Sequence, residues 1–172
     1  MTDTAPNTAT AQQLDAEQAR KHAAISKRLE VSLGQFVVLM MRSPHYRHHT
    51  LGDLEWLVTP PVLAGQFAIA EAQSKDNGFT APVAAVTWAR VSPEVTAKLT
   101  ASIEKPFRLR PDEWKSGDDI WVIDAHGDAK VITSMLQRMA ENEWKGQQVR
   151  VRIAGKDGKP EIKLFTGGAA AA

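Results

Sequence analysis

The sequence contains no cysteine, which excludes disulfide bonds, cysteine catalysis and thiolate metal sites. Its net charge is only +1 at pH 7, so it lacks the global basic field of a nucleic-acid-binding domain. No hydrophobic run approaches the ~18 apolar residues that a membrane span needs. We therefore expect no nucleic-acid partner, no stable membrane insertion and a reducing compartment.

The 172 residues, of which 43% are hydrophobic, are enough for one domain with a substantial core. The segment 1–13 is rich in Thr and Ala and lacks the cationic start and apolar stretch of a secretory signal. The segment 167–172 consists of small residues. We predict disordered tails at 1–13 and 167–172, and a folded domain at 14–166.

Hydrophobic periodicity and turn residues predict helices at 14–42, 93–103 and 129–144, and strands at 66–73, 83–91, 120–124, 149–153 and 162–165. Gly34 is a candidate break in the first helix, and 51–59 fits either a helix or a strand. Ser92 and Asp128 are predicted N-caps. The mixture of helices and hairpins predicts an α/β fold with a mixed, mostly antiparallel sheet flanked by helices.

Histidines are the most conspicuous candidates for chemistry, because His45, His48 and His49 lie close together and His126 follows a predicted strand. They fit a polar loop as well as a functional site. A metal site is disfavoured, since no cysteine or close carboxylate set accompanies them. The remaining interpretation is a general base, which needs a partner to orient its ring.

Asp124 is the natural partner for such a histidine, because it ends the apolar strand at 120–124. A helix cap or a turn is the structural alternative for this residue. Ser43 offers a hydroxyl, but no nucleophile-elbow pattern surrounds it, so a turn is favoured there. The residues alone indicate an α/β domain with a candidate His–Asp site.

Four segments taken together resemble the lysine acyltransferases that activate RTX toxins, the hemolysin-activating protein family. They are Ser43-Pro44 followed by Arg47, Pro61 with Gln66-Phe67, 83–92 containing Trp88-Ala89, and Trp114-Lys115-Ser116-Gly117-Asp118 followed by Trp121-Val122-Ile123-Asp124. The similarity covers about residues 35–152. Its strongest part is the last segment.

The resemblance implies a GNAT-like acyltransferase fold for 14–166. It also implies transfer of a fatty acyl group from acyl-acyl carrier protein to an internal lysine of an RTX-type protein in the cytoplasm. Acyl carrier protein and the RTX-type protein are the expected partners, with no cofactor beyond the acyl donor and no metal. A homodimer is left open.

Catalysis in the family depends on one aspartate and one histidine, and the aspartate corresponds to Asp124. The histidine precedes the arginine, which is the position of Tyr46 in this sequence. If 45–49 is extended, alternate side chains share a face. Tyr46 and His48 then point the same way, so we predict His48 as the catalytic histidine. Ser43 and Arg47 are the predicted substrate-binding residues.

Two further groups of residues fit this interpretation. Val37, Leu39, Met40 and Met41 are candidates for an acyl channel, although core packing is the favoured explanation for them. Arg108, Arg110, Lys115, Lys145, Arg150 and Arg152 are candidates for docking an acidic carrier protein. The alternatives are a non-catalytic binding module with this fold and a coenzyme A-dependent N-acetyltransferase, whose phosphate-binding loop is not evident in the sequence.

Overall fold

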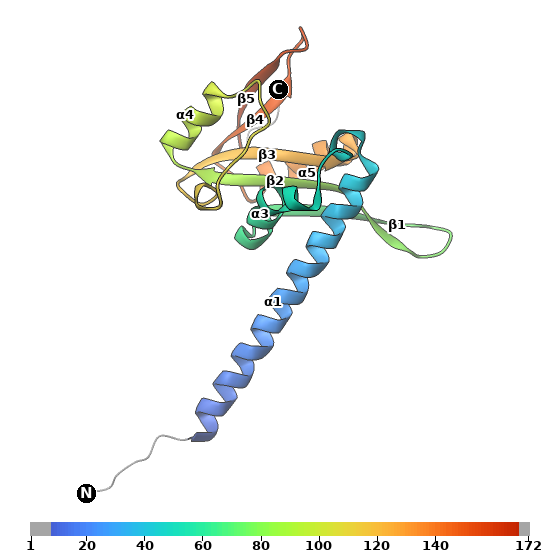
Figure 1. Cartoon of the computed structure of the whole chain (residues 1–172), viewed down its shortest axis with the longest axis vertical. Helices are drawn as coiled ribbons and strands as arrows, with labels where there is room; N and C mark the ends of the chain where they lie inside the picture. The colour runs from blue at the N-terminus through green and yellow to red at the C-terminus, as the bar shows by residue number, and fades with distance from the viewer. Residues whose placement is uncertain (1–7, 169–172) are drawn as a thin grey trace, which may run out of the picture.

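The computed structural model describes residues 8–168 and forms an α/β fold (Figure 1). The helices are α1 Thr8–Arg42, α2 Leu54–Leu57, α3 Thr59–Ala64, α4 Pro93–Ala101 and α5 Ala129–Glu141. Three short 3-10 helices are η1 Pro44–Tyr46, η2 Leu51–Asp53 and η3 Pro111–Glu113. The strands are β1 Phe67–Gln73, β2 Thr80–Val91, β3 Asp119–Gly127, β4 Gln148–Ala154 and β5 Pro160–Thr166.

The five strands form one sheet in the order β1-β2-β3-β4-β5. All neighbours are antiparallel except β3 and β4, which are parallel. This confirms the predicted mixed, mostly antiparallel sheet flanked by helices, and it is consistent with a GNAT-like acyltransferase fold. The β3–β4 pairing runs only from Ile120 to Val122 of β3, so the second half of β3 is not paired with β4.

Helices cover both faces of the sheet. On one face, α1 and the short helices after it pack over β1 and β2 through a cluster that includes Phe36, Leu39, Val58 and Ala85. On the other face, Met139 of α5 packs with residues of β2, β3 and β4. Beside α1, helix α4 covers a third cluster around Trp121. A site on the α1 face is therefore enclosed by α1 and the segment 43–64.

Helix α1 is continuous from Thr8 to Arg42, so Gly34 does not break it. An added Cβ at Gly34 would meet nothing within 4 Å, which means that this glycine serves no close contact. The first half of α1 extends away from the sheet (Figure 1). Helix α1 includes residues 8–13, the last six residues of the segment that we predict as an N-terminal tail. Residues 1–7 lie outside the described part of the chain.

Gly167, the first residue of the predicted C-terminal tail, is hydrogen-bonded to the folded part of the chain. The Gly167 N–H donates to the Gln147 carbonyl, and the Gly167 carbonyl accepts from Gly146. A Cβ at Gly167 would lie only 1.9 Å from the Trp144 carbonyl oxygen. Gly167 is thus packed against the end of α5, and residues 169–172 lie outside the described part of the chain.

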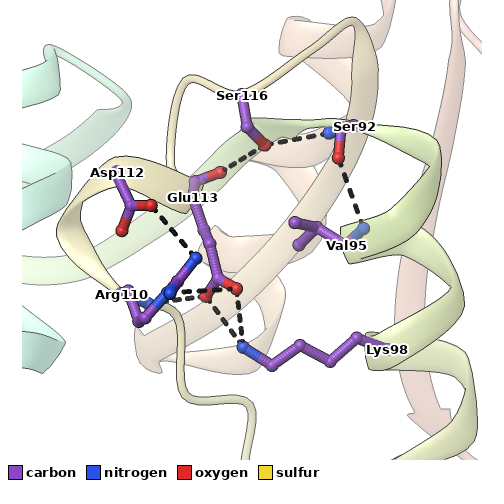
Figure 2. A network of polar contacts seen from close by, with 7 residues as sticks. All are labelled: Ser92, Val95, Lys98, Arg110, Asp112, Glu113 and Ser116. Atoms are coloured by element: carbon purple, nitrogen blue, oxygen red, sulfur yellow. Dashed lines mark hydrogen bonds and ion pairs between the residues drawn. The ribbon is translucent and has the colours of Figure 1, made fainter.

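The connection between α4 and β3 is fixed by a polar network around Glu113 (Figure 2). The buried Glu113 carboxylate accepts hydrogen bonds from Lys98 of α4 at 2.8 Å and from the Arg110 N–H at 2.7 Å. The Ser116 hydroxyl donates to the Glu113 carbonyl and accepts from the Ser92 N–H. Arg110 forms ion pairs with Asp112 and Glu113 on the outer side of the turn.

Candidate functional site

Asp124 lies on the α1 face of the sheet because β3 contains a bulge. The register pairs Thr87 with Asp124 but Trp88 with Val122, so one extra residue stands in β3. Ile120 and Val122 face α5, and strict alternation would send Asp124 to that face as well. The bulge shifts the phase, so that Asp124 and His126 face α1 while Ala125 packs toward α5.

The Tyr46 hydroxyl is the nearest described hydrogen-bond donor to the Asp124 carboxylate. It lies 2.6 Å from both carboxylate oxygens, and the Ala125 N–H donates to Oδ1 at 2.8 Å. The pKa of Tyr46 is raised above its ordinary value of 10.0, first by burial and then by the charge of Asp124. The phenol therefore keeps its proton and acts as a donor, so it cannot serve as the base.

His126 provides the imidazole closest to Asp124. Its Nε2 lies 3.7 Å from Asp124 Oδ2, and its ring packs between Tyr46 and Phe36, with centroids 4.5 and 5.8 Å away. Burial lowers the pKa of His126, and the charge of Asp124 opposes that shift. His126 is therefore neutral near pH 7. Its Nδ1 has no hydrogen-bond partner among the described residues, although the side chain is only 1% exposed.

The predicted residues near Tyr46 are only partly brought together. Residues 44–46 form the 3-10 helix η1, and the His49 N–H bonds back to the Tyr46 carbonyl at 3.0 Å. The prediction that 45–49 is an extended segment is wrong, so residues two apart do not share a face. The His48 side chain is exposed, and the described contacts include no hydrogen bond or ion pair between His48 and Asp124. The catalytic role of His48 stays a prediction.

The other histidines of the cluster surround the Tyr46 ring. The centroids of His45 and His49 lie 4.8 and 5.3 Å from the Tyr46 centroid. Ser43 caps η1 without a side-chain bond, and its carbonyl accepts from the Tyr46 N–H. Ser43 thus shapes the turn that presents Tyr46. Within the described chain, no group of three or more His, Asp or Glu side chains could hold a metal ion.

A cavity of about 330 Å³ opens between the C-terminal end of α1 and the segment 46–54. Its lining includes Arg47 and Tyr46, and the Tyr46 hydroxyl donates to Asp124, which is not itself in the lining. Val37, Met40 and Met41 line it as candidates for an acyl channel, whereas Leu39 is buried in the neighbouring core cluster. Leu51 and Leu54 complete the wall, and no local pattern predicted them as lining residues.

Several of the basic side chains proposed for docking are engaged within the molecule. Arg150 Nη1 lies 3.1 Å from Asp119 Oδ1, and Arg152 donates to the carbonyls of Ile103 and Lys105. Arg108 stacks over Trp56 at 4.8 Å but remains exposed. Lys115 and Lys145 are exposed and have no ion pair with another described side chain. Of the basic side chains considered, Arg47 is the one in the lining of the cavity.

An α/β fold with a buried His–Tyr–Asp cluster beside a cavity defines a candidate acyltransferase site, and comparison with known families agrees. The model of the RTX toxin acyltransferase family matches residues 26–166. The match covers most of the chain, including every residue of the site. The chain belongs to this family of enzymes.

Curated relatives support the same assignment. The chain is 27% identical over 128 residues to the RTX-II toxin-activating lysine-acyltransferase ApxIIC of Actinobacillus pleuropneumoniae, covering 73% of this chain and 74% of the relative. It is 27% identical over 136 residues to the leukotoxin-activating lysine-acyltransferase LktC of a Pasteurella haemolytica-like species, covering 79% and 77%. It is 30% identical over 139 residues to the RTX-I toxin-activating lysine-acyltransferase ApxIC of Actinobacillus pleuropneumoniae, covering 79% and 74%.

Among the described residues, no helix combines the length and the apolar character that crossing a membrane requires.

Proposed function

We propose that this protein is a cytoplasmic protein-lysine acyltransferase that moves a fatty acyl group from acyl-acyl carrier protein to an internal lysine of an RTX-type protein. The observation that carries the proposal is the Asp124 carboxylate. It accepts a hydrogen bond from the Tyr46 hydroxyl at 2.6 Å and keeps 24% of its side chain exposed, and Tyr46 is one of the residues that line the cavity. An anchored, partly open carboxylate beside an apolar cavity suits proton transfer at a bound substrate.

The reaction joins the lysine nitrogen to the thioester carbonyl carbon while the C–S bond breaks. The amine loses a proton, and the departing thiol takes one up. A free lysine has a pKa near 10.4, so the amine needs a base close to neutrality. The carboxylate of Asp124 stabilises the positive charge that develops on that base or on the attacking amine.

The end of β3 argues against coenzyme A as the donor. A diphosphate would bind at the N-terminus of a helix that follows a strand, where free N–H groups point outward. Here the Asp128 carboxylate accepts from the N–H groups of Lys130 and Val131 at that position on α5. Gly127 approaches β2 so closely that a Cβ would lie 2.1 Å from the Val83 carbonyl oxygen. The connection therefore offers a carboxylate where a phosphate would need open donors.

Two imidazoles are proposed for the base on different grounds. The resemblance proposes His48, through its place after Arg47. The geometry favours His126, which is neutral and lies 3.7 Å from Asp124. A shift of the His126 ring by less than 1 Å would bring Nε2 within about 3.2 Å of the carboxylate. We therefore favour His126 as the partner of Asp124.

The test is the intact mass of a candidate RTX-type protein co-expressed with this chain and acyl carrier protein. We expect a mass increase equal to one or more fatty acyl groups. In vitro, acyl-acyl carrier protein should support transfer and acyl-coenzyme A should not. Transfer should fall as salt rises, because exposed charge pairs are screened over about 8–10 Å at 0.1–0.15 M salt. Equal rates with both donors, independent of salt, would reject the carrier-protein donor.

Single alanine substitutions separate the two histidines. If His126 partners Asp124, His126→Ala should abolish transfer and His48→Ala should retain it. Loss confined to His48→Ala would restore the interpretation from the resemblance. Each variant needs a check of folding by circular dichroism, especially His126→Ala, because that ring is buried. His126→Gln provides a polar replacement of similar size where His126→Ala does not fold.

One observation favours a second candidate function, a binding module that has lost the chemistry. Tyr46 stands where the family register places a histidine, and its phenol is a donor instead of a base. Under this alternative the protein binds the RTX-type partner without changing its mass. Co-purification without acylation, in the presence of loaded carrier protein, would establish the module and reject the enzyme.

A further inference from the structure

A groove of about 700 Å³ lies where α1 passes the edge of the sheet, away from the cavity at 46–54. Its lining comes from α1 and from Phe67, Ala68, Ile69 and Glu71 of β1. In the described chain β1 has β2 as its one neighbouring strand, so its outer edge is unpaired. Such an edge presents backbone N–H and C=O groups with which an added strand can pair.

The two edge strands of the sheet differ in their protection against a further strand. Strand β5 carries Pro160, Glu161 and Lys163, residue types that discourage pairing at an exposed edge. Strand β1 contains no proline or lysine, and Glu71 is its one charged residue. Its register with β2 shifts between Ala70 and Glu71, so the regular part of this edge is the apolar run 67–70. The β1 edge is therefore the one open to strand addition.

Helix α1 forms a wall beside this open edge. The Gln35 amide donates to the Glu71 carboxylate, which joins the helix to β1, and the preceding turns of α1 continue past β1 (Figure 1). From Gln35 back to Ala24 the helix extends about 16 Å, and neighbouring strands lie about 4.8 Å apart. One more strand therefore fits beside β1 against α1. The α1 residues that line the groove recur at helical spacing and are Ala24, Lys27, Arg28, Val31, Ser32 and Gln35.

The charges of the groove are mainly basic. Lys27 and Arg28 are exposed, and neither forms an ion pair with another described side chain. The acidic residue of the lining, Glu71, already accepts a hydrogen bond from Gln35. Val31 lies one turn after the basic pair on the same helix and is 53% exposed. The groove is therefore complementary to an extended segment that carries acidic side chains and an apolar one.

The strand register places this edge near the Asp124 site. Phe67 pairs with Thr87, and Thr87 pairs with Asp124, so the three residues form a row across β1, β2 and β3. An added strand would lie three strand spacings, roughly 14 Å, from β3. A lysine within that strand could not reach Asp124, but a lysine elsewhere on the same partner could. The groove therefore suits docking of a protein that is modified at a different segment.

We propose that an extended, acidic segment of the RTX-type substrate adds to β1 in this groove as a further strand and holds the substrate on the enzyme. The proposal rests on the proposed function. Backbone hydrogen bonds to β1 supply affinity, while acidic side chains pair with Lys27 and Arg28 and an apolar one covers Val31. Because the segment is remote from the reacting lysine, its loss raises KM and leaves kcat nearly unchanged.

The first test fills the groove with Ala24→Trp. The probe is the unacylated RTX-type protein of the intact-mass experiment, and its affinity is measured by biolayer interferometry, which needs no catalysis. We expect the affinity to fall by about tenfold or more, because the indole occupies the place of the added strand. Ala23→Trp is the matched control, since Ala23 is equally on the exposed part of α1 but does not line the groove.

The second test reverses the basic charges. Lys27→Glu combined with Arg28→Glu should weaken binding of the same probe by about tenfold, because two attractive charge pairs become repulsive. Lys156→Glu combined with Lys159→Glu changes the net charge equally at the exposed turn between β4 and β5, and it should change the affinity by less than about twofold.

The third test detects strand addition directly by hydrogen–deuterium exchange. Amides on the open edge of β1 should exchange about tenfold more slowly when the RTX-type protein is bound, because they gain hydrogen-bond partners. Unchanged exchange across 67–73 in the complex would overturn the proposal. Slower exchange that grows with the concentration of this protein alone would assign the edge to a second copy and would also overturn it.

The outcomes separate this proposal from the proposed function. Acyl transfer with equal KM and affinity in Ala24→Trp and Ala23→Trp would overturn the groove assignment alone. Binding that depends on Ala24, Lys27 and Arg28, without acylation of any lysine, would overturn the proposed function and keep the groove as a docking site. Equal weakening by the two charge reversals would reject the acidic segment as the occupant.

Discussion

The two ends of β3 carry carboxylates in opposite surroundings. Asp119 begins the strand, where β3 lies between β2 and β4. Its oxygens accept the Thr96 hydroxyl at 2.7 Å and pair with Arg150 at 3.1 Å, and Thr96 in turn accepts from the Trp121 indole N–H. The Thr96 contacts join α4 to β3, and the Arg150 ion pair joins β4 to β3. It is an arrangement that stabilises the fold.

Asp124 lies beyond the bulge, where β3 has no partner on the β4 side. Around it, His126 Nδ1, His49 Nδ1 and Thr87 Oγ1 are buried without a hydrogen-bond partner among the described residues. Buried polar atoms without partners reduce stability. At the Asp119 end, Arg150 Nη1 also lacks a hydrogen bond, but it lies 3.1 Å from the Asp119 carboxylate. The Asp119 end therefore holds its buried charge in an ion pair, while the Asp124 end keeps three buried polar atoms without a partner among the described residues.

The largest expected effect is the loss of acyl transfer when Asp124, but not Asp119, is replaced. Asp124→Asn should lower the rate of acyl transfer by about 10²- to 10⁴-fold, the usual contribution of a proton-transfer group. The amide keeps an oxygen that can accept from Tyr46, so the variant should remain folded. Rates are measured by intact mass of the acylated substrate over time. Full activity in a folded Asp124→Asn protein would remove Asp124 from the mechanism.

Asp119→Asn should produce the reverse pattern. Loss of the charged partner of Thr96 and Arg150 should lower the free energy of unfolding by about 1–2 kcal/mol, since the side chain is one-third exposed. The rate of acyl transfer per folded molecule should stay within about threefold of the wild-type rate, which corresponds to a change of ~0.6 kcal/mol in the activation barrier. Urea unfolding measures the free energy of unfolding, and the intact-mass assay measures the rate of acyl transfer. A catalytic defect as large as that of Asp124→Asn would erase the distinction between the two ends.

Tyr46→Phe tests how much the hydrogen bond from the Tyr46 hydroxyl to Asp124 contributes to stability and activity. The variant removes the donor to Asp124 and should cost about 1 kcal/mol of stability, because water can replace it at a carboxylate that is 24% exposed. Activity should fall by less than tenfold if the phenol only positions the carboxylate. Urea midpoints and transfer rates measure both. Complete loss of transfer, as in Asp124→Asn, would instead place the phenol at the reacting atoms.

The smallest expected effect is a pH dependence of stability. Burial lowers the pKa of His126 below 6.5, whereas the unfolded chain takes up the proton near that value. Between the two pKa values the unfolded state binds more protons, so the free energy of unfolding falls as the pH drops below about 6.5. His126→Gln should lose this part of the acid sensitivity. Urea midpoints at about pH 7.5 and about pH 5 measure it, with His22→Gln on the exposed part of α1 as the control.

Local signals in the sequence predicted most of the elements. Ser92 and Asp128 cap α4 and α5 with their side chains, as their residue types and spacing indicate. The hairpin of β1 and β2 follows from two apolar runs around the turn at 74–79. The undecided segment 51–59 is helical, because its apolar residues pack under α1 in a way that no local pattern specifies.

The first half of the segment that carries most of the resemblance, Trp114 to Asp118, is structural. Trp114 is 2% exposed, Ser116 links the turn to α4, and a Cβ at Gly117 would lie 2.6 Å from the Val91 carbonyl oxygen. These residues position β3 and do not contact the Asp124 site. Family membership was therefore readable from residues that build the scaffold, while the register of the histidine near Tyr46 was not.

The sequence by itself determined the helix caps, the order of the main elements and the family, because each depends on residue type and local spacing, and it singled out Asp124 as a candidate site residue. Only the tertiary structure decided which side chains meet Asp124. Alternation along β3 would place Asp124 and His126 on the α5 face, and the bulge against β2 turns both toward Tyr46. A bulge pairs two residues with one on a neighbouring strand, so it depends on distant partners and leaves no periodic signal in the strand's own sequence.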